Sequence, residues 1–213
     1  MTATFTEPAP YGYLYAGLRV DPPTRVPFVR RSARRAEVLR RCAAVAARLA
    51  ESPEVVAATV YEAVFMPPAA GHPRFDVLVL VETATPAALA TVSLGDLGAD
   101  FVMAARNVRR IGDIDRSRTG VFLFNHFTAP DVDRALRTWE PIAGWFTHEA
   151  GVVDSALLEP VQASPYVFVN HVRLPCAPIR FFLRLLKPSF RGAVSRRLRA
   201  EGIGFAAVAC RAV

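Results

Sequence analysis

Apolar runs with the composition of strands alternate with helical periodicity in the second half of the chain. Residues 120–129, GVFLFNHFTA, predict a strand, whereas the apolar residues of 131–151 recur at helical spacing. Asp131 suits the start of that helix and Gly151 its end. Further strands are predicted over 152–161, 166–174 and 205–213, with a helix interrupted at Pro188 over 177–202. The order is therefore β-α-β-β-α-β.

The first half repeats this order less regularly. Its polar end, residues 113–118, predicts a junction between two units, 11–113 and 119–213, and residues 1–10 are expected to form a flexible tail. The first unit is expected to be a degenerate copy and the second to carry the site. In the first unit, strands are predicted over 11–20, 54–66, 74–83 and 101–112, and helices over 32–50 and 85–97.

A β-α-β-β-α-β unit is the ferredoxin-like motif, in which a four-stranded antiparallel sheet carries helices on one face. The other face is apolar and has to be covered. Packing the two sheets against each other covers both faces. The predicted fold is therefore α+β, with two tandem ferredoxin-like units forming a pseudo-dimeric α/β barrel, active as a monomer or a homodimer.

The dipeptide Asn-His occurs twice inside predicted buried strands, at Asn125-His126 and Asn170-His171. A buried polar group without a partner costs about 1–3 kcal/mol. The first and third strands of the motif are adjacent, so the two asparagines can meet between sheet and helices, with the histidines on the barrel side, or the reverse. The asparagines can also simply satisfy each other. Val79 occupies the matching position in the first half, which favours a single site.

The basic charge of the chain would ordinarily suggest nucleic acid as a partner, but its distribution does not. The net charge is +7 and the pI about 10.0, yet of 26 Lys and Arg residues only Lys187 is a lysine. The arginine pairs at 30–31, 34–35 and 40–41 lack interleaved aromatic residues, so they are interpreted as a solvated helix face. No nucleic-acid partner is predicted.

Membrane, secretion and cofactor signals are weak or absent in the sequence. No run reaches the roughly 18 apolar residues of a membrane span, and the N-terminus lacks a secretion signal. The stretch 179–190, IRFFLRLLKPSF, is basic and amphipathic enough for a membrane surface, but the fold needs its apolar residues inside. Cys42, Cys176 and Cys210 lack metal-type spacing, which favours a cytoplasmic protein. No phosphate loop, dinucleotide fingerprint or metal motif occurs, so neither a cofactor nor a metal is expected.

Residues 120 to about 195 resemble the antibiotic biosynthesis monooxygenase family of the dimeric α/β-barrel superfamily. The family shows a strand ending in Val-Asn-x-x-x-Trp, and Val169-Asn170 matches its Val-Asn, whereas Leu174 stands at the tryptophan position. The segment PSFRGAV, 188–194, is similar to a later family segment. The resemblance implies cofactor-free oxygenation of a phenol held by the asparagine, and the missing tryptophan weakens that implication.

Four polar side chains are the candidate catalytic residues. The amide N–H groups of Asn170 and Asn125 can stabilise an oxyanion, and the imidazole of His171 or His126 can take a phenolic proton. Trp139 is interpreted as a core residue because it follows the apolar stripe of its helix. Arg173 can pair with a substrate carboxylate or with Asp154. The candidate substrate-binding residues are His148, Trp145, Phe127, Phe168, Leu174 and Arg173.

These features favour a cofactor-independent monooxygenase-like enzyme of specialised metabolism. Its expected ligand is a hydrophobic aromatic or polyketide-type small molecule with a phenolic group. A cofactor-free polyketide cyclase or isomerase would use the same groups. A heme-binding protein that uses one histidine, and a non-catalytic ligand-binding or partner protein, are the further alternatives.

Overall fold

The computed structural model describes residues 2–24, 27–67, 73–113 and 119–213. Its strands are β1 (Gly12–Leu18), β2 (Val55–Phe65), β3 (Val77–Thr83), β4 (Phe101–Ile111), β5 (Phe122–Thr128), β6 (Ser155–Pro160), β7 (Phe168–Arg173) and β8 (Gly204–Ala212). Its helices are α1 (Ala33–Ala50), α2 (Val132–Ala150), α3 (Pro178–Arg184), α4 (Pro188–Phe190) and α5 (Arg196–Ala200), with a 3-10 segment, η1 (Pro86–Thr91), and a π-helical segment, η2 (Arg191–Ser195).

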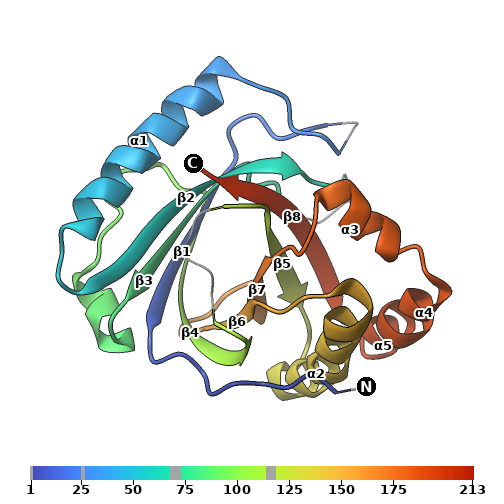
Figure 1. Cartoon of the computed structure of the whole chain (residues 1–213). Coiled ribbons are helices and arrows are strands. Elements are labelled where there is room, and N and C mark those ends of the chain that lie inside the picture. Colours follow the sequence, from blue (N-terminus) through green and yellow to red (C-terminus); the bar gives the residue numbers. More distant parts are fainter. Residues whose placement is uncertain (1, 25–26, 68–72, 114–118) are drawn as a thin grey trace.

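In the described part of the chain, eight antiparallel strands close into a barrel with the order β1-β3-β2-β8-β5-β7-β6-β4. The strands of each half are neighbours, and the halves join where β2 pairs with β8 and β4 with β6. The helices lie outside, with α1 on one side of the barrel and α2 to α5 on another (Figure 1). The predicted α+β class and the closed barrel are confirmed.

The long helices begin at side chains that cap them. The Ser32 hydroxyl accepts a hydrogen bond from the Arg35 N–H, and the Asp131 carboxylate accepts one from the Arg134 N–H. Each satisfies a backbone donor that the first helical turn leaves open. Gly151 ends α2 with φ of 71°, a left-handed conformation that glycine adopts without steric cost. The predicted start and end of this helix are confirmed.

Two predicted helices differ from the structure. The helix expected over 85–97 is only η1, Pro86–Thr91, because the backbone becomes extended at Val92 and Gly95 takes a positive φ of 61°. The helix expected over 177–202 is divided into α3, α4, η2 and α5. Pro188, which has no N–H to donate, begins the second part of this region.

The barrel interior is filled by aromatic and aliphatic side chains, whereas separate apolar cores form under the outer helices. Packed rings therefore occupy the barrel interior, which is the space that a ligand inside the barrel would need. Its largest side chains are Tyr13, Tyr15, Tyr61, Phe75, Phe122 and Phe124.

Arg35 corrects the interpretation of the arginine pairs as a solvated face, because its side chain is buried. Its guanidinium lies 3.2 Å from the carboxylate of Glu62 and 3.2 Å from that of Asp76. Asp76 also accepts hydrogen bonds from the backbone of Val20 and Asp21. Arg35 therefore pairs with two carboxylates beneath α1, and Glu62 has a second cation in Arg211.

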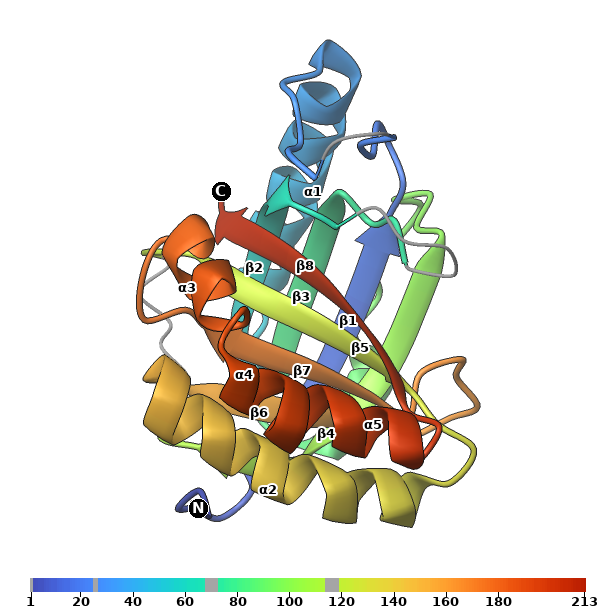
Figure 2. The ribbon, with the colours of Figure 1, turned by 90° about the vertical axis from the view of Figure 1, so that its right-hand side faces the viewer.

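Residues 2–10, expected as a flexible tail, lie against both halves of the molecule. Thr6 pairs with Arg110 of β4, and the Ala9 N–H donates to the Asn107 side chain. Figure 2 shows this segment ending beside α2.

Among the described residues, none of the helices combines the length and apolar character needed to cross a membrane. Nor do these residues contain a group of three or more His, Cys, Asp or Glu side chains placed to hold a metal ion.

Candidate ligand pocket

The strand register places Asn125 of β5 directly opposite Asn170 of β7. The pairs on either side on the same face are apolar, Leu123 with Val172 and Phe127 with Phe168. Both asparagines line a pocket between the sheet and the outer helices. They form one polar rung on an otherwise apolar face.

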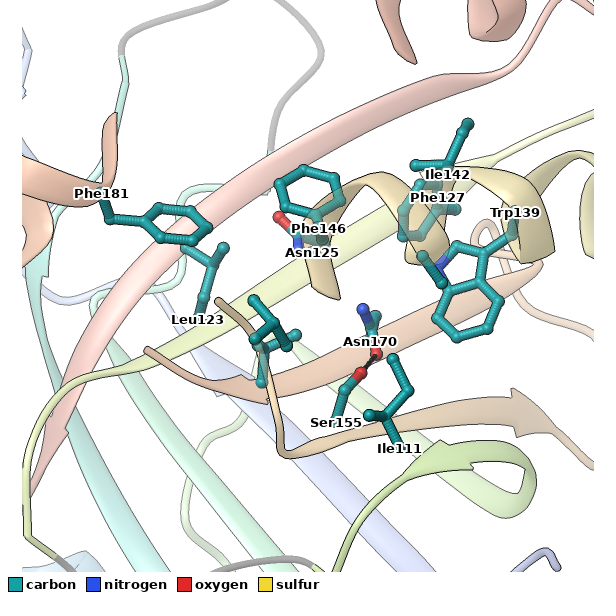
Figure 3. Close-up of a pocket in the computed structure, with 13 residues that line it drawn as sticks. Ile111, Leu123, Asn125, Phe127, Trp139, Ile142, Phe146, Ser155, Asn170 and Phe181 are labelled. Carbon is teal, nitrogen blue, oxygen red and sulfur yellow. Dashed lines mark hydrogen bonds between the residues drawn. The ribbon is translucent and has the colours of Figure 1, made fainter. Parts of the chain in front are cut away.

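Ser155 of β6 orients one of these amides. Its hydroxyl donates a hydrogen bond of 2.8 Å to Oδ1 of Asn170, so the amide nitrogen of Asn170 turns away from Ser155 toward the pocket (Figure 3). Among the residues that the structure describes, none hydrogen-bonds the side chain of Asn125. Two amide groups are therefore available to a ligand at the sheet.

The pocket has two adjoining parts with walls that are mostly aromatic and aliphatic. Neither part has an ionisable side chain among its described lining residues. The part beside α2 leaves about 30 Å³, and the part beside α3 to α5 about 40 Å³, for the centre of a water-sized sphere. Each holds a few waters at most, since one water needs roughly 10–15 Å³ by this measure. Both parts share Leu123, Asn125, Phe127, Ile142, Phe146 and Phe181.

His126 and His171 lie on the opposite face of the sheet, inside the barrel. Nε2 of His126 is 2.8 Å from the Tyr15 hydroxyl, and its Nδ1 is 3.3 Å from the carbonyl oxygen of Ala206. Nε2 of His171 is 3.3 Å from the Tyr61 hydroxyl, and burial lowers the pKa of His171 to about 4. The four candidate catalytic residues thus do not converge, because β5 and β7 separate imidazoles from amides.

The predicted substrate-binding residues divide in the same way. Phe127 lines both parts of the pocket, whereas the buried Phe168 and Leu174 line neither. The Trp145 indole N–H donates to the Ser189 hydroxyl at 3.2 Å, which joins α2 to α4.

The other two predicted binding residues lie away from the pocket. Nε2 of the exposed His148 is 3.4 Å from the carbonyl oxygen of Thr2. The guanidinium of Arg173 hydrogen-bonds Thr119. Of the six predicted binding residues, Phe127 alone is a wall of this pocket.

Several pocket residues were not singled out from the sequence. Trp139 was interpreted as core, and it is buried, but its ring also lines the part beside α2. Phe146 and Phe181 bring the aromatic walls from α2 and α3. Helical periodicity could identify these residues as buried, but it carries no signal for the space left beside them.

The N-terminal segment packs on Trp139, which is one wall of the pocket. The ring of Phe5 stacks on the Trp139 ring with 5.8 Å between centroids. Ala3 and Phe5 also pack against the apolar core of the second half. A ligand that enters beside Trp139 would have to displace this segment.

At the matching strand positions of the first half, the structure shows an apolar pair in place of the asparagine rung. There Ala16 of β1 lies opposite Val79 of β3, between the apolar pairs Leu14 with Val81 and Leu18 with Val77. All of these side chains pack in the core under α1. The amide pair is therefore particular to the second half.

No protein-family model matches the chain, and no curated protein matches it in sequence. Solved structures do match its fold. An anthrone oxidase-like protein superimposes with a TM-score of 0.64 at 12% identity, over 100% of this chain and 94% of that one.

Two candidate monooxygenases are also similar. The protein from Fusobacterium nucleatum has a TM-score of 0.58 at 8% identity, covering 100% of this chain and 94% of its own. The protein from Lactobacillus acidophilus has a TM-score of 0.52 at 9% identity, covering 95% of this chain and 98% of its own. At such identities the likeness shows the fold alone: an α+β barrel of the type found in these monooxygenase-like proteins.

Proposed function

We propose that this chain is a monooxygenase-like enzyme that uses no cofactor and oxidises a hydrophobic phenolic molecule. The observation that carries the proposal is the pair of amides, Asn125 and Asn170, facing each other across an apolar pocket. An amide N–H in a site with little water stabilises a developing oxyanion. The names of the structural neighbours support the same reaction class.

The pocket restricts the substrate to compounds that lose a proton readily. The polar side-chain groups among its described lining residues are those of Asn125, Ser155 and Asn170 and the indole N–H of Trp139, and none of these is a base near neutral pH. His126 and His171 face the barrel instead. The substrate therefore has to ionise by its own acidity, as fused-ring phenols and anthrones do.

The oxidation balances without a further reactant. The bound phenolate gives electrons to O₂, a ring C–H becomes C=O, and one water leaves, so that a phenol and O₂ yield a quinone and water. The protein's part is to hold the ring between aromatic walls and the oxyanion against the amides of Asn125 and Asn170. Trp139 supplies an indole wall, although Leu174 stands at the tryptophan position of the family motif.

The proposal also concerns how the two halves of the chain are related to a known family. We propose that residues 11–113 and 119–213 are two ferredoxin-like units related to the antibiotic biosynthesis monooxygenase family, and that the second unit carries the site. A role in aromatic or polyketide metabolism follows from the apolar pocket. The cyclase and heme-binding alternatives have less support, because no described acid, base or histidine lines the pocket.

Oxygen uptake tests this function. Anthrone or a naphthol is added to the protein without any cofactor, and uptake is compared with that of N125A/N170V. This variant rebuilds the Ala16–Val79 rung of the first half, so it keeps the packing pattern of the fold while removing both amides. We expect uptake by the wild type, its loss in the variant, and a rate that rises with pH through the substrate's pKa.

A non-catalytic partner protein is the second candidate, because the closed pocket has space only for waters, whereas ligand sites usually occupy about 300–1,000 Å³. Equal oxygen uptake with the wild type, with N125A/N170V and without protein would favour this second function and contradict the first.

A further inference from the structure

Helix α3 is apolar on two sides. Phe181 is buried, and Phe182 and Leu185 are partly buried against the core of the second half. On the outside, Ile179 is 61% exposed, Leu183 59% and Leu186 68%. These three residues follow i, i+4, i+7 spacing, which places them on one face of the helix and the turn that continues it. We call these three side chains the α3 ridge.

The α3 ridge needs an explanation beyond the fold. Single exposed apolar side chains are normal on a protein surface, whereas three large ones side by side form an apolar patch, a feature that is common at interaction sites. The packing of the barrel does not require them, since Phe181 and its neighbours already fill the inner face.

The surroundings of the ridge are cationic. Residues 178–200 include seven Lys and Arg residues and no Asp or Glu. Arg180 follows Ile179 and Lys187 follows Leu186, so a cation flanks the ridge at each end, and both are exposed, although Lys187 also pairs with Glu149 at 2.9 Å. The seven residues are Arg180, Arg184, Lys187, Arg191, Arg196, Arg197 and Arg199.

We propose that the α3 ridge docks on the surface of an anionic lipid bilayer. Ile179, Leu183 and Leu186 enter the boundary between headgroups and acyl chains, while Arg180 and Lys187 meet the lipid phosphates. The apolar ridge matches the acyl chains of this partner, and the cations that border it match the negative charge of the lipid phosphates. A second copy of the chain fits poorly, because it would bring two cationic segments together.

Docking would place the ligand pocket at the lipid surface. The inner face of the same helix, with Phe181, Phe182 and Leu185, is a wall of the pocket part beside α3 to α5. A hydrophobic ligand dissolved in the bilayer could then enter past α3. This route rests on the proposed function, whereas the docking itself does not.

Co-sedimentation with vesicles tests the docking without any substrate. The full chain is mixed with phosphatidylglycerol vesicles or with phosphatidylcholine vesicles. We expect binding to the anionic vesicles, weaker binding at high salt, and little binding to the zwitterionic ones. No binding to phosphatidylglycerol would overturn the proposal, while oxygen uptake would be unaffected by that result.

Matched variants distinguish binding through the α3 ridge from nonspecific hydrophobic binding and from binding driven by net charge alone. I179S/L183S/L186S should abolish binding, whereas V102S/V153S/V161S, which removes exposed apolar residues elsewhere, should not. R180Q/K187Q should weaken binding roughly 25-fold, at about 1 kcal/mol for each cation. R34Q/R41Q on the exposed side of α1 removes the same net charge and should change binding little.

Three outcomes would sink the proposal even if the vesicles bind. The first is that R180Q/K187Q and R34Q/R41Q weaken vesicle binding equally. The second is that I179S/L183S/L186S and V102S/V153S/V161S lose vesicle binding equally. The third is that the wild type is a dimer, and that I179S/L183S/L186S is a monomer with unchanged vesicle binding. Circular dichroism and melting temperature establish that each variant is folded.

Discussion

The hydroxyl of Ser155 and the side-chain carbonyl of Asn170 are joined by a buried hydrogen bond of 2.8 Å. This bond determines which end of the Asn170 amide faces the pocket, and so makes Ser155 of β6 a positioning residue for the site.

Replacing Ser155 by alanine should lower stability by about 1–3 kcal/mol, because the carbonyl of Asn170 loses its partner. It should also weaken ligand binding, since the amide can then rotate. Denaturant unfolding of S155A, N170V and the double variant measures the coupling. In the N170V background S155A should no longer destabilise the fold, because the buried Ser155 hydroxyl has already lost its partner there, and an undiminished cost would show that Ser155 acts through some other contact.

Phe5 holds the N-terminal segment over the pocket through its stacking on Trp139. An aromatic pair contributes about 0.5–1.5 kcal/mol, so Phe5→Ala should speed the association of a pocket ligand by about 2- to 10-fold. Stopped-flow measurement of tryptophan fluorescence would follow this rate. Val102→Ala is the control, because Val102 is 53% exposed and lines neither part of the pocket. Equal rates in all three proteins would show that the segment is not a barrier.

Arg35→Met should destabilise the fold by about 3–5 kcal/mol, because it removes the guanidinium that pairs with the buried carboxylate of Asp76, although Glu62 keeps its ion pair with Arg211. Arg34→Met changes the neighbouring exposed arginine and should cost less than about 0.5 kcal/mol. The two free energies of unfolding, measured in denaturant at neutral pH, test this difference. A cost for Arg35→Met as small as that for Arg34→Met would contradict a structural role for the buried ion pairs.

His171 should make the fold less stable as the pH falls. Burial lowers its pKa from 6.5 to about 4, so between these values the unfolded chain binds a proton that the folded barrel excludes. The contribution is fully present above pH 6.5 and is lost as the pH falls toward 4, by about 3 kcal/mol in total.

The free energy of unfolding of His171→Phe should therefore depend less on pH in this window. His148→Gln, at an exposed position, should keep the wild-type dependence. If His171→Phe and the wild type have parallel pH profiles, the imidazole is not buried in its neutral form.

The asparagine pair shows how far the sequence could predict this site. Alternation along two strands allowed Asn125 and Asn170 to share one face but left open the register and which face it would be, and counting residues gave Val79 as the apolar counterpart of Asn170. These inferences depend only on the two-residue period of a strand and on which strands are neighbours.

The misses involve partners distant in the chain. Arg35 meets Glu62 and Asp76, which are 27 and 41 residues away, so an exposed-looking arginine pair gave no sign of burial. Trp139 has the periodicity of any core residue, and only the three-dimensional packing shows the pocket at its side. The prediction of a helix over 85–97 was wrong about its length. A proline at the first helical position and apolar residues at helical spacing do not show at which residue the helical backbone hydrogen bonds end.

The closed order of the strands has a consequence for any attempt to divide the chain. Because β2 bonds to β8 and β4 to β6, cutting between the halves would leave four unpaired strand borders and uncover the aromatic filling of the barrel. The unpaired strands of such a fragment would form hydrogen bonds with strands of other molecules, so we expect it to aggregate. The strands that carry Asn125 and Asn170 therefore need the first half in order to fold, although both asparagines belong to the second half.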